Sequence, residues 1–145
     1  MIKDKSSIYL SIFKRKGGEG IKTKIINRDN ENQFKALFSN LSDQEKPLIT
    51  FFENISNWIL LTNNRIIINK QDSFSFVKID EIIEVVPALK EELKNGIYQK
   101  NNFTKLKLGL KNNDNVILDL EQGLPYKGLY QVLHFIKSDN ISSLS

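Results

Sequence analysis

The sequence predicts one α+β domain that is mainly β. We expect a bent antiparallel sheet or open barrel of about seven strands, followed by a C-terminal helix and preceded by an N-terminal extension. Three features indicate this class. Two apolar runs meet at Asn63-Asn64, as in a β-hairpin. Apolar and polar residues alternate along residues 103–110 and 116–121, as in half-buried strands, and apolar residues within 129–136 recur at helical spacing.

Composition excludes several classes of protein. The 145 residues fit one domain, which is large enough to bury a core without disulfides or a metal. The absence of cysteine excludes a disulfide framework, a thiolate nucleophile and a cysteine-based zinc site. No apolar run approaches the roughly 20 residues of a membrane-spanning helix, and the first apolar run is too broken for a signal peptide. We therefore expect a cytoplasmic protein.

Positive charge is concentrated near the N-terminus. The chain carries a net charge of +4, and its first 30 residues contain eight basic and three acidic residues. Such a segment can attract anionic lipid or nucleic acid, or it can be an ordinary solvated surface. The candidate anion- or lipid-binding residues are Lys14, Arg15, Lys16, Lys22 and Lys24.

Residues 1–40 form the predicted basic extension. Apolar residues within 6–16 predict a short amphipathic helix or a strand, and the glycines within 17–20 predict a hinge. Residues 22–26 fit a strand. An Asp-Asn pair then suits the start of a helix over residues 31–40. We expect the extension to pack a short helix against the domain.

Short strands dominate after residue 40. Their apolar runs are bounded by turn-forming residues such as Pro, Gly and Asn. A short helix fits between Pro87, which ends a strand, and Asn95-Gly96. The predicted strands cover residues 48–52, 58–62, 65–70, 73–79, 82–86, 103–110 and 116–121.

The hairpin at Asn63-Asn64 also predicts a register. A two-residue type I′ turn needs positive φ at both central positions, which Asn tolerates. Such a turn pairs Thr62 with Arg65 and divides the ribbon into two faces. One face is wholly aliphatic and suits the core. The other contains Trp58, Leu60 and Ile67.

The face of Trp58, Leu60 and Ile67 needs a cover, because a bent sheet normally leaves this side to solvent. In one alternative the N-terminal extension covers it, through apolar residues within 34–38 or 8–13. In the other, a second protein covers it, with Trp58 as a large apolar anchor.

The C-terminal helix offers a second candidate surface. Pro125 suits its first turn, and an apolar stripe faces the core. Tyr126, Tyr130 and His134 form a second line along the helix. This line is either a partner-binding surface or an ordinary half-buried flank. Residues 139–145 are expected to form a frayed tail.

Two stretches resemble a known family. In the first, Glu45 precedes the run Leu61-Thr62-Asn63-Asn64-Arg65. This pattern resembles the opening of bacterial pleckstrin-homology-like (PH/GRAM-like) domains, where an acidic entry precedes a Leu-Thr-x-x-Arg hairpin. In the second, the run from Val116 to Tyr126, leading into Val132-Leu133, resembles small bacterial proteins of the same kind. The resemblance covers about residues 41–138 and implies a PH-like domain there.

Several activities are disfavoured. The resemblance implies a phosphoinositide site built from Lys and Arg around the first strand loop, but residues 53–57 contain no cation. His134 is the single histidine and lacks a partner at the spacing of a catalytic dyad, so we expect no enzyme. No carboxylate cluster suggests a metal, and we expect no cofactor. Nucleic-acid binding is disfavoured because aromatic residues do not interleave with the basic ones.

We therefore expect a non-catalytic, protein-binding domain. By analogy it is a toxin-neutralising immunity protein or an adaptor. The alternative is weak peripheral attachment to an anionic membrane through the basic N-terminal segment. The partner and the oligomeric state stay open. The candidate partner-binding residues are Trp58, Leu60, Ile67, Tyr126 and Tyr130.

Overall fold

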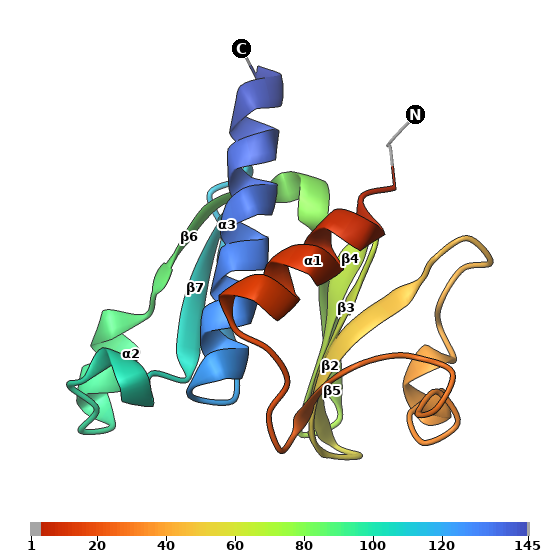
Figure 1. The fold of residues 1–145 in the computed structure, drawn as a ribbon. Helices are drawn as coiled ribbons and strands as arrows, with labels where there is room; N and C mark the ends of the chain where they lie inside the picture. The colour runs from red at the N-terminus through yellow and green to blue at the C-terminus, as the bar shows by residue number, and fades with distance from the viewer. Residues whose placement is uncertain (1–3, 145) are drawn as a thin grey trace.

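The structure, a computed structural model that describes residues 4–144, confirms the α+β class. Two open antiparallel sheets stand beside a long C-terminal helix, and the N-terminal helix crosses that helix (Figure 1). In chain order the elements are α1 (Ser6–Lys16), β1 (Thr23–Ile25), η1 (Lys35–Phe38), β2 (Pro47–Asn54), β3 (Asn57–Thr62), β4 (Arg65–Lys70), β5 (Ser73–Lys78), η2 (Ile79–Glu81), β6 (Ile82–Pro87), α2 (Leu89–Lys94), η3 (Lys100–Asn102), β7 (Lys105–Leu110), β8 (Asn115–Asp119) and α3 (Leu124–Leu144).

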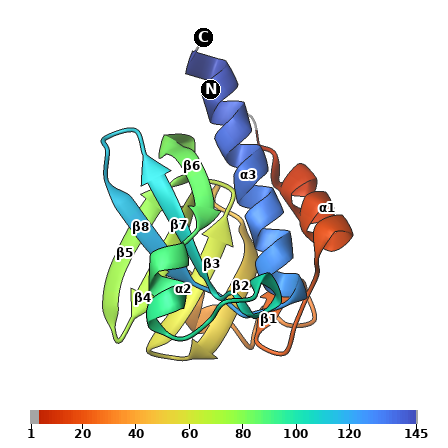
Figure 2. The same ribbon diagram turned by 90° about the vertical axis from the view of Figure 1, so that its left-hand side faces the viewer.

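Strand order follows chain order in both sheets. The larger sheet has the order β1-β2-β3-β4-β5, and the smaller has the order β6-β7-β8 (Figure 2). Each strand predicted after residue 40 is present, as β2 to β8. In the β3–β4 hairpin Leu61 pairs with Ile66 and Leu60 pairs with Ile67, which confirms the predicted register.

The type I′ turn predicted at residues 63–64 is wrong. Within the described chain, positive φ occurs at other non-glycine residues. The Thr62 hydroxyl accepts hydrogen bonds from the main-chain N–H groups of Asn64 and Arg65, at 3.1 and 3.0 Å, so a side chain closes this turn. A turn with positive φ at both central residues instead joins β4 to β5, at Gln71-Asp72, with φ values of 53° and 64°.

The main core joins both sheets to α1 and α3. The apolar stripe of α3 is buried from Leu129 to Ile136. Residues 6–16 form a helix, and its Phe13 is completely buried. Phe13 packs on Gly128 of α3, where an added Cβ would lie 2.7 Å from the Phe13 ring. Glycine at this position therefore allows the two helices to cross at close range.

The glycine stretch predicted as a hinge is anchored instead. An added Cβ at Gly17 would lie 2.2 Å from the Leu124 carbonyl oxygen, so the end of α1 touches the start of α3. A few residues later, Glu121 accepts the main-chain N–H groups of Ile21 and Lys22, at 2.8 and 3.0 Å. These contacts fix the path from α1 into β1.

The helix predicted over residues 31–40 is wrong in extent. Turns precede η1, which is a short 3₁₀ helix. Asn side chains compete with helix formation here: the N–H groups of Asp29 and Asn30 donate to Asn27 Oδ1, and the N–H of Asn27 donates to Asn30 Oδ1. The predicted apolar contact survives nonetheless, because Phe34 and Leu37 are buried against the outer face of β3 and β4.

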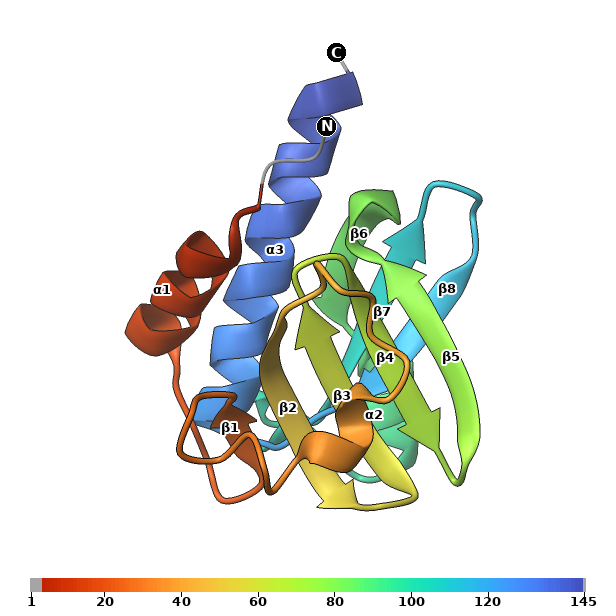
Figure 3. The ribbon, with the colours of Figure 1, turned by 90° about the vertical axis from the view of Figure 1, so that its right-hand side faces the viewer.

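This contact decides which group covers the face of Trp58, Leu60 and Ile67. The three side chains are 5%, 0% and 7% exposed. They form a second apolar cluster with Phe34 and Leu37. The short helical turn of the extension lies over the face of β3 and β4 in Figure 3. The extension is therefore the cover, through its 34–38 segment, whereas the 8–13 segment joins the main core. Trp58, Leu60 and Ile67 were expected to contact a partner, and their burial beneath the extension does not fit that role.

The tail predicted for residues 139–145 is helical as far as Leu144, and residue 145 lies outside the described chain. Asn140 anchors this part of α3, because its side-chain amide donates to the carbonyl oxygens of Ile79 and Ile82, at 2.7 and 2.8 Å. Lys5 and Asp139 form an ion pair that ties the start of α1 to α3. Between residues 4 and 144, no helix has the length and apolar character needed to cross a membrane.

Candidate functional site

The short helical turn η1 lies over β3 and β4 and does not extend over β5 (Figure 3). Phe74 and Phe76 of β5 are 58% and 52% exposed. Phe76 pairs with Ile67 across the strands, so both aromatic side chains share the face of Trp58. The Phe74 ring meets the Trp58 ring edge-on, with centroids 5.9 Å apart. The buried cluster thus extends to the surface as an aromatic ridge.

β5 is also an open edge of the larger sheet, since β4 is its one neighbour among the described strands. Lys70 and Ser73 flank the two-residue turn. In such a hairpin the flanking pair is hydrogen-bonded, and the bonding then alternates along the strand. Phe74 and Phe76 therefore point their main-chain N–H and C=O groups away from β4. We call this combination of free backbone groups and exposed Phe74 and Phe76 the β5 edge.

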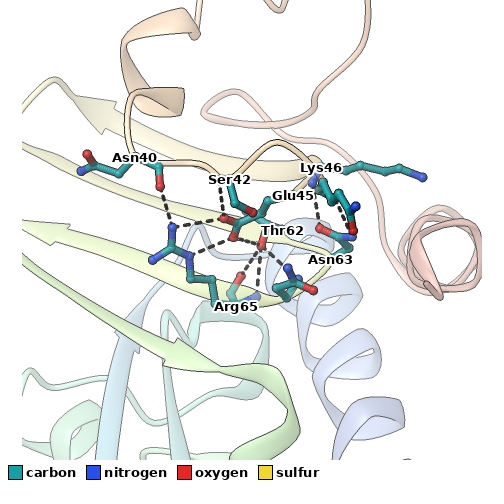
Figure 4. Close-up of polar contacts among 9 residues, drawn as sticks. Asn40, Ser42, Glu45, Lys46, Thr62, Asn63 and Arg65 are labelled. Atoms are coloured by element: carbon teal, nitrogen blue, oxygen red, sulfur yellow. Dashed lines mark hydrogen bonds and ion pairs between the residues drawn. The ribbon is translucent and has the colours of Figure 1, made fainter. Parts of the chain in front are cut away.

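A polar network lies at one end of the β5 edge (Figure 4). Glu45 is 7% exposed and accepts hydrogen bonds from Arg65 Nε at 2.9 Å and Arg65 Nη2 at 3.1 Å. The Thr62 hydroxyl donates to the same carboxylate at 2.6 Å, and the Ser42 N–H donates at 3.3 Å. Arg65 Nη2 also donates to the Asn40 carbonyl oxygen at 2.9 Å. The network ties the loop before β2 to the β3–β4 hairpin.

The electrostatics of this network favour an ionised Glu45. Burial alone would raise the pKa of Glu45, but hydrogen bonds from Arg65 and Thr62 outweigh burial and hold that pKa below its usual value of 4.5. Arg65 also lies over the Phe76 ring, with 5.0 Å from the guanidinium carbon to the ring centroid. The network thereby restricts an aromatic side chain of the β5 edge.

Two hollows border the β5 edge. One has a volume of about 450 Å³ and lies between the loop before β2 and β5, beside Arg65 and Phe76. The other has a volume of about 220 Å³ and lies between η1 and β5, beside Asn69 and Phe74. Asn69 is 4% exposed, and its Oδ1 has no hydrogen-bond partner in the described structure. The edge therefore combines backbone groups, aromatic rings and flanking space.

The other candidate partner-binding residues lie elsewhere. Tyr126 is buried, and its hydroxyl donates to the Lys105 carbonyl oxygen at 2.9 Å. Burial raises the pKa of Tyr126. Tyr130 is half-buried and contacts His134. These tyrosines line a cavity that shares no lining residue with the two hollows of the β5 edge.

The basic candidates do not form one patch. The first three, residues 14–16, lie in the exposed last turn of α1. Lys22 instead forms an ion pair with Glu53, with Nζ 2.7 Å from Oε2. Lys24 is half-buried on β1. Only the helical group remains as a compact cationic segment.

Sequence reasoning missed Phe74 and Phe76. The signal was the alternation Ser73-Phe74-Ser75-Phe76, which places two aromatic side chains on one face of a strand. Extending the hairpin register by one strand would have placed them beside Trp58. The sequence could not show how much of this face the extension covers, because that depends on where the 34–38 segment packs.

Comparisons with protein-family models, curated proteins and solved structures found no match for this chain. Within residues 4–144, no three histidine or acidic side chains converge in a way that could hold a metal ion.

Proposed function

We propose that this protein is a non-catalytic, protein-binding domain that takes an extended segment of its partner along the β5 edge. The supporting observation is the coincidence of free main-chain groups with exposed Phe74 and Phe76 on one edge strand. An added strand gains main-chain hydrogen bonds, and its alternate side chains occupy neighbouring hollows.

The lack of protection on β5 supports this proposal. Natural edge strands are commonly blunted by bulges, proline or charged side chains, because an open apolar edge invites pairing with another chain. β5 is six residues long and pairs with β4 without a register shift. Its single charge is Lys78, at the end of the strand. An open edge of this kind is available for pairing with a strand from another chain.

We propose in addition that residues 41–138 are a PH-like domain. The support is the order of seven strands and a helix, together with the meeting of Glu45, Thr62 and Arg65, the residues that carry the resemblance. The narrower proposal of an immunity protein or adaptor rests on analogy. Identification of a toxin encoded beside this protein's gene would support it.

The test is selection of displayed peptides on the immobilised protein, followed by affinity measurements on purified variants. Phe76→Pro removes an outward N–H but keeps the bonds to β4, because proline is tolerated where the N–H faces solvent. We expect Phe76→Pro to lower the affinity for the selected peptides at least tenfold. Phe74→Ser should also lower peptide affinity, because it removes an exposed aromatic ring. Selected peptides should protect the amides of β5 from hydrogen exchange.

Leu89→Ser is the matched control, because Leu89 is 55% exposed on α2, away from β5. It removes a similar apolar side chain and should leave peptide affinity unchanged. Circular dichroism would verify the fold of each variant. Recovery of no peptide, or equal affinity of wild type and Phe76→Pro, would contradict the proposal.

The alternative proposal is peripheral attachment to an anionic membrane through α1. Its support is the exposure of Lys14 and Arg15, neither of which forms an ion pair within the described chain. Flotation with phosphatidylserine vesicles tests it. Lys14→Gln combined with Arg15→Gln should abolish flotation, and unchanged flotation would rule this segment out.

A further inference from the structure

The cavity beside Tyr126 and Tyr130, a third hollow of about 450 Å³, is lined by basic and aromatic side chains from three parts of the chain. Lys16 comes from the end of α1, Lys127 from the first turns of α3, and Lys100 from η3. Phe103 and Tyr130 provide aromatic surface. We call this the three-lysine pocket. Its volume is that of a typical small-molecule site.

The charge of the three-lysine pocket is one-sided. None of its lining residues is acidic. Within the described chain, Lys16, Lys100 and Lys127 make no ion pair, so no carboxylate neutralises their charges. Three ammonium groups around one cavity create a positive potential that attracts a multiply charged anion.

One wall of the pocket is apolar and held in place. Tyr126 meets Phe103 edge-on, with ring centroids 6.4 Å apart. The Tyr126 hydroxyl is already bonded to the Lys105 carbonyl oxygen, so this ring presents an apolar surface to the cavity. Tyr130 stands one helical turn further along α3. Phe103 and Tyr126 are buried, so the half-buried Tyr130 is the ring that offers a flat surface against which a planar group can stack.

The frame around the lysines is anchored from both sides. The close approach of Gly17 to Gly128, 2.4 Å from an added Cβ to the Gly128 nitrogen, fixes the end of α1 on α3 beside Lys16. On the other side, buried Glu92 of α2 accepts the Thr104 N–H at 2.8 Å, next to Phe103. The lysine side chains are exposed, and these contacts hold the backbone of the elements that carry them.

We propose that the three-lysine pocket binds an organic anion that carries both phosphate groups and a planar ring. The ammonium groups of Lys16, Lys100 and Lys127 neutralise the phosphates, because several cations are needed for a multiply charged group. The aromatic wall contacts the ring. The ligand class that has both groups is a soluble, nucleotide-like molecule, since a phospholipid headgroup supplies the phosphate without the ring. The site is independent of the β5 edge, with which it shares no lining residue.

The test measures binding of three probes at low ionic strength: adenosine triphosphate, inorganic tripolyphosphate, and phosphatidylcholine vesicles with or without phosphatidylserine. We expect adenosine triphosphate to bind more tightly than tripolyphosphate, since only the nucleotide has a ring. Lys16→Gln combined with Lys127→Gln should lower the affinity for the nucleotide at least tenfold. Tyr130→Ala should weaken the nucleotide but not tripolyphosphate.

Lys14→Gln combined with Arg15→Gln is the matched control, because it removes the same charge from α1 without touching the pocket lining. This variant should keep full nucleotide affinity. Vesicle binding that depends on Lys16 and Lys127, without nucleotide binding, would identify a lipid headgroup as the ligand and overturn the proposal of a ring-bearing anion. Failure of all three probes, or equal losses in the two double variants, would overturn the proposal. Peptide binding at the β5 edge is unaffected by either result.

Discussion

The Glu45 carboxylate links one residue to the pH dependence of the whole fold. Its pKa lies below the usual 4.5, so its stabilising contribution is complete above that value and is lost as pH falls through the lower folded-state value. We expect Glu45→Gln to lower the free energy of unfolding by about 1–3 kcal/mol at neutral pH, because Arg65 loses its partner. The deficit should shrink under acid. Urea denaturation across the acid range measures both effects.

Asp43→Asn is the control for Glu45→Gln, since Asp43 is exposed on the same loop and forms no ion pair within the described chain. It should leave stability almost unchanged at every pH. A constant gap between wild type and Glu45→Gln from neutral to acid pH would show that Glu45 does not titrate in this way.

At the residue scale, sequence reasoning succeeded where spacing decides the structure. The pairing of Leu61 with Ile66 follows from the number of residues in the turn, and it is present. The backbone angles of the turn could not be predicted in the same way. The Thr62 hydroxyl accepts the hydrogen bonds that close the turn, so positive φ at residues 63 and 64 is not needed. A side chain that substitutes for backbone geometry leaves little trace in residue propensity.

The short 34–38 segment around η1 covers the second apolar cluster. Its packing can be monitored by the fluorescence of one tryptophan. Trp58 is the single tryptophan and is buried beneath this segment. Leu37→Ala should cost about 2–5 kcal/mol of stability and shift the Trp58 emission to longer wavelength, because water reaches the indole.

Ala36→Ser, at an exposed position of the same segment, should change neither stability nor emission. An unshifted emission maximum in a destabilised Leu37→Ala protein would mean that the segment stays in place and that the loss arises from the cavity alone. By the same burial, Trp58→Ala should be strongly destabilising, which excludes it as a test of partner binding.

At the element scale, the strongly patterned elements were predictable and the weakly patterned ones were not. The alternation in residues 103–110 and the stripe in 129–136 became β7 and α3. The 31–40 helix failed because the Asn27 and Asn30 side chains form local turns before any helix begins. The tail became helix because Asn140 finds two carbonyl oxygens on a distant segment.

For the molecule as a whole, the N-terminal extension is part of the fold. Tyr9, Ile12 and Phe13 of α1 belong to the main core. Deleting residues 1–20 should therefore abolish cooperative unfolding, measured by circular dichroism during a urea titration. The control, Lys14→Gln combined with Arg15→Gln, should leave the unfolding transition cooperative. A cooperative transition in the deletion variant would show that the sheets and α3 form a self-sufficient core.

The whole-molecule prediction from sequence reached the fold class but not the location of the candidate site. Residue patterns report which face of an element is apolar, and they identified the face of Trp58. The division of that face between η1 and solvent depends on contacts between residues 34–38 and a sheet formed later in the chain. The β5 edge is the part that this division leaves uncovered.

The crossing of α1 over α3 sets the order in which the protein can become compact during synthesis. α1 precedes all the strands and α3 follows them, so Phe13 can contact Gly128 only after α3 has left the ribosome. Until then the β-hairpins must exist with their inner faces unsatisfied, because a contact of such long sequence separation forms late. A β-hairpin that forms before α3 is present therefore exposes apolar surface, and such species are prone to aggregate.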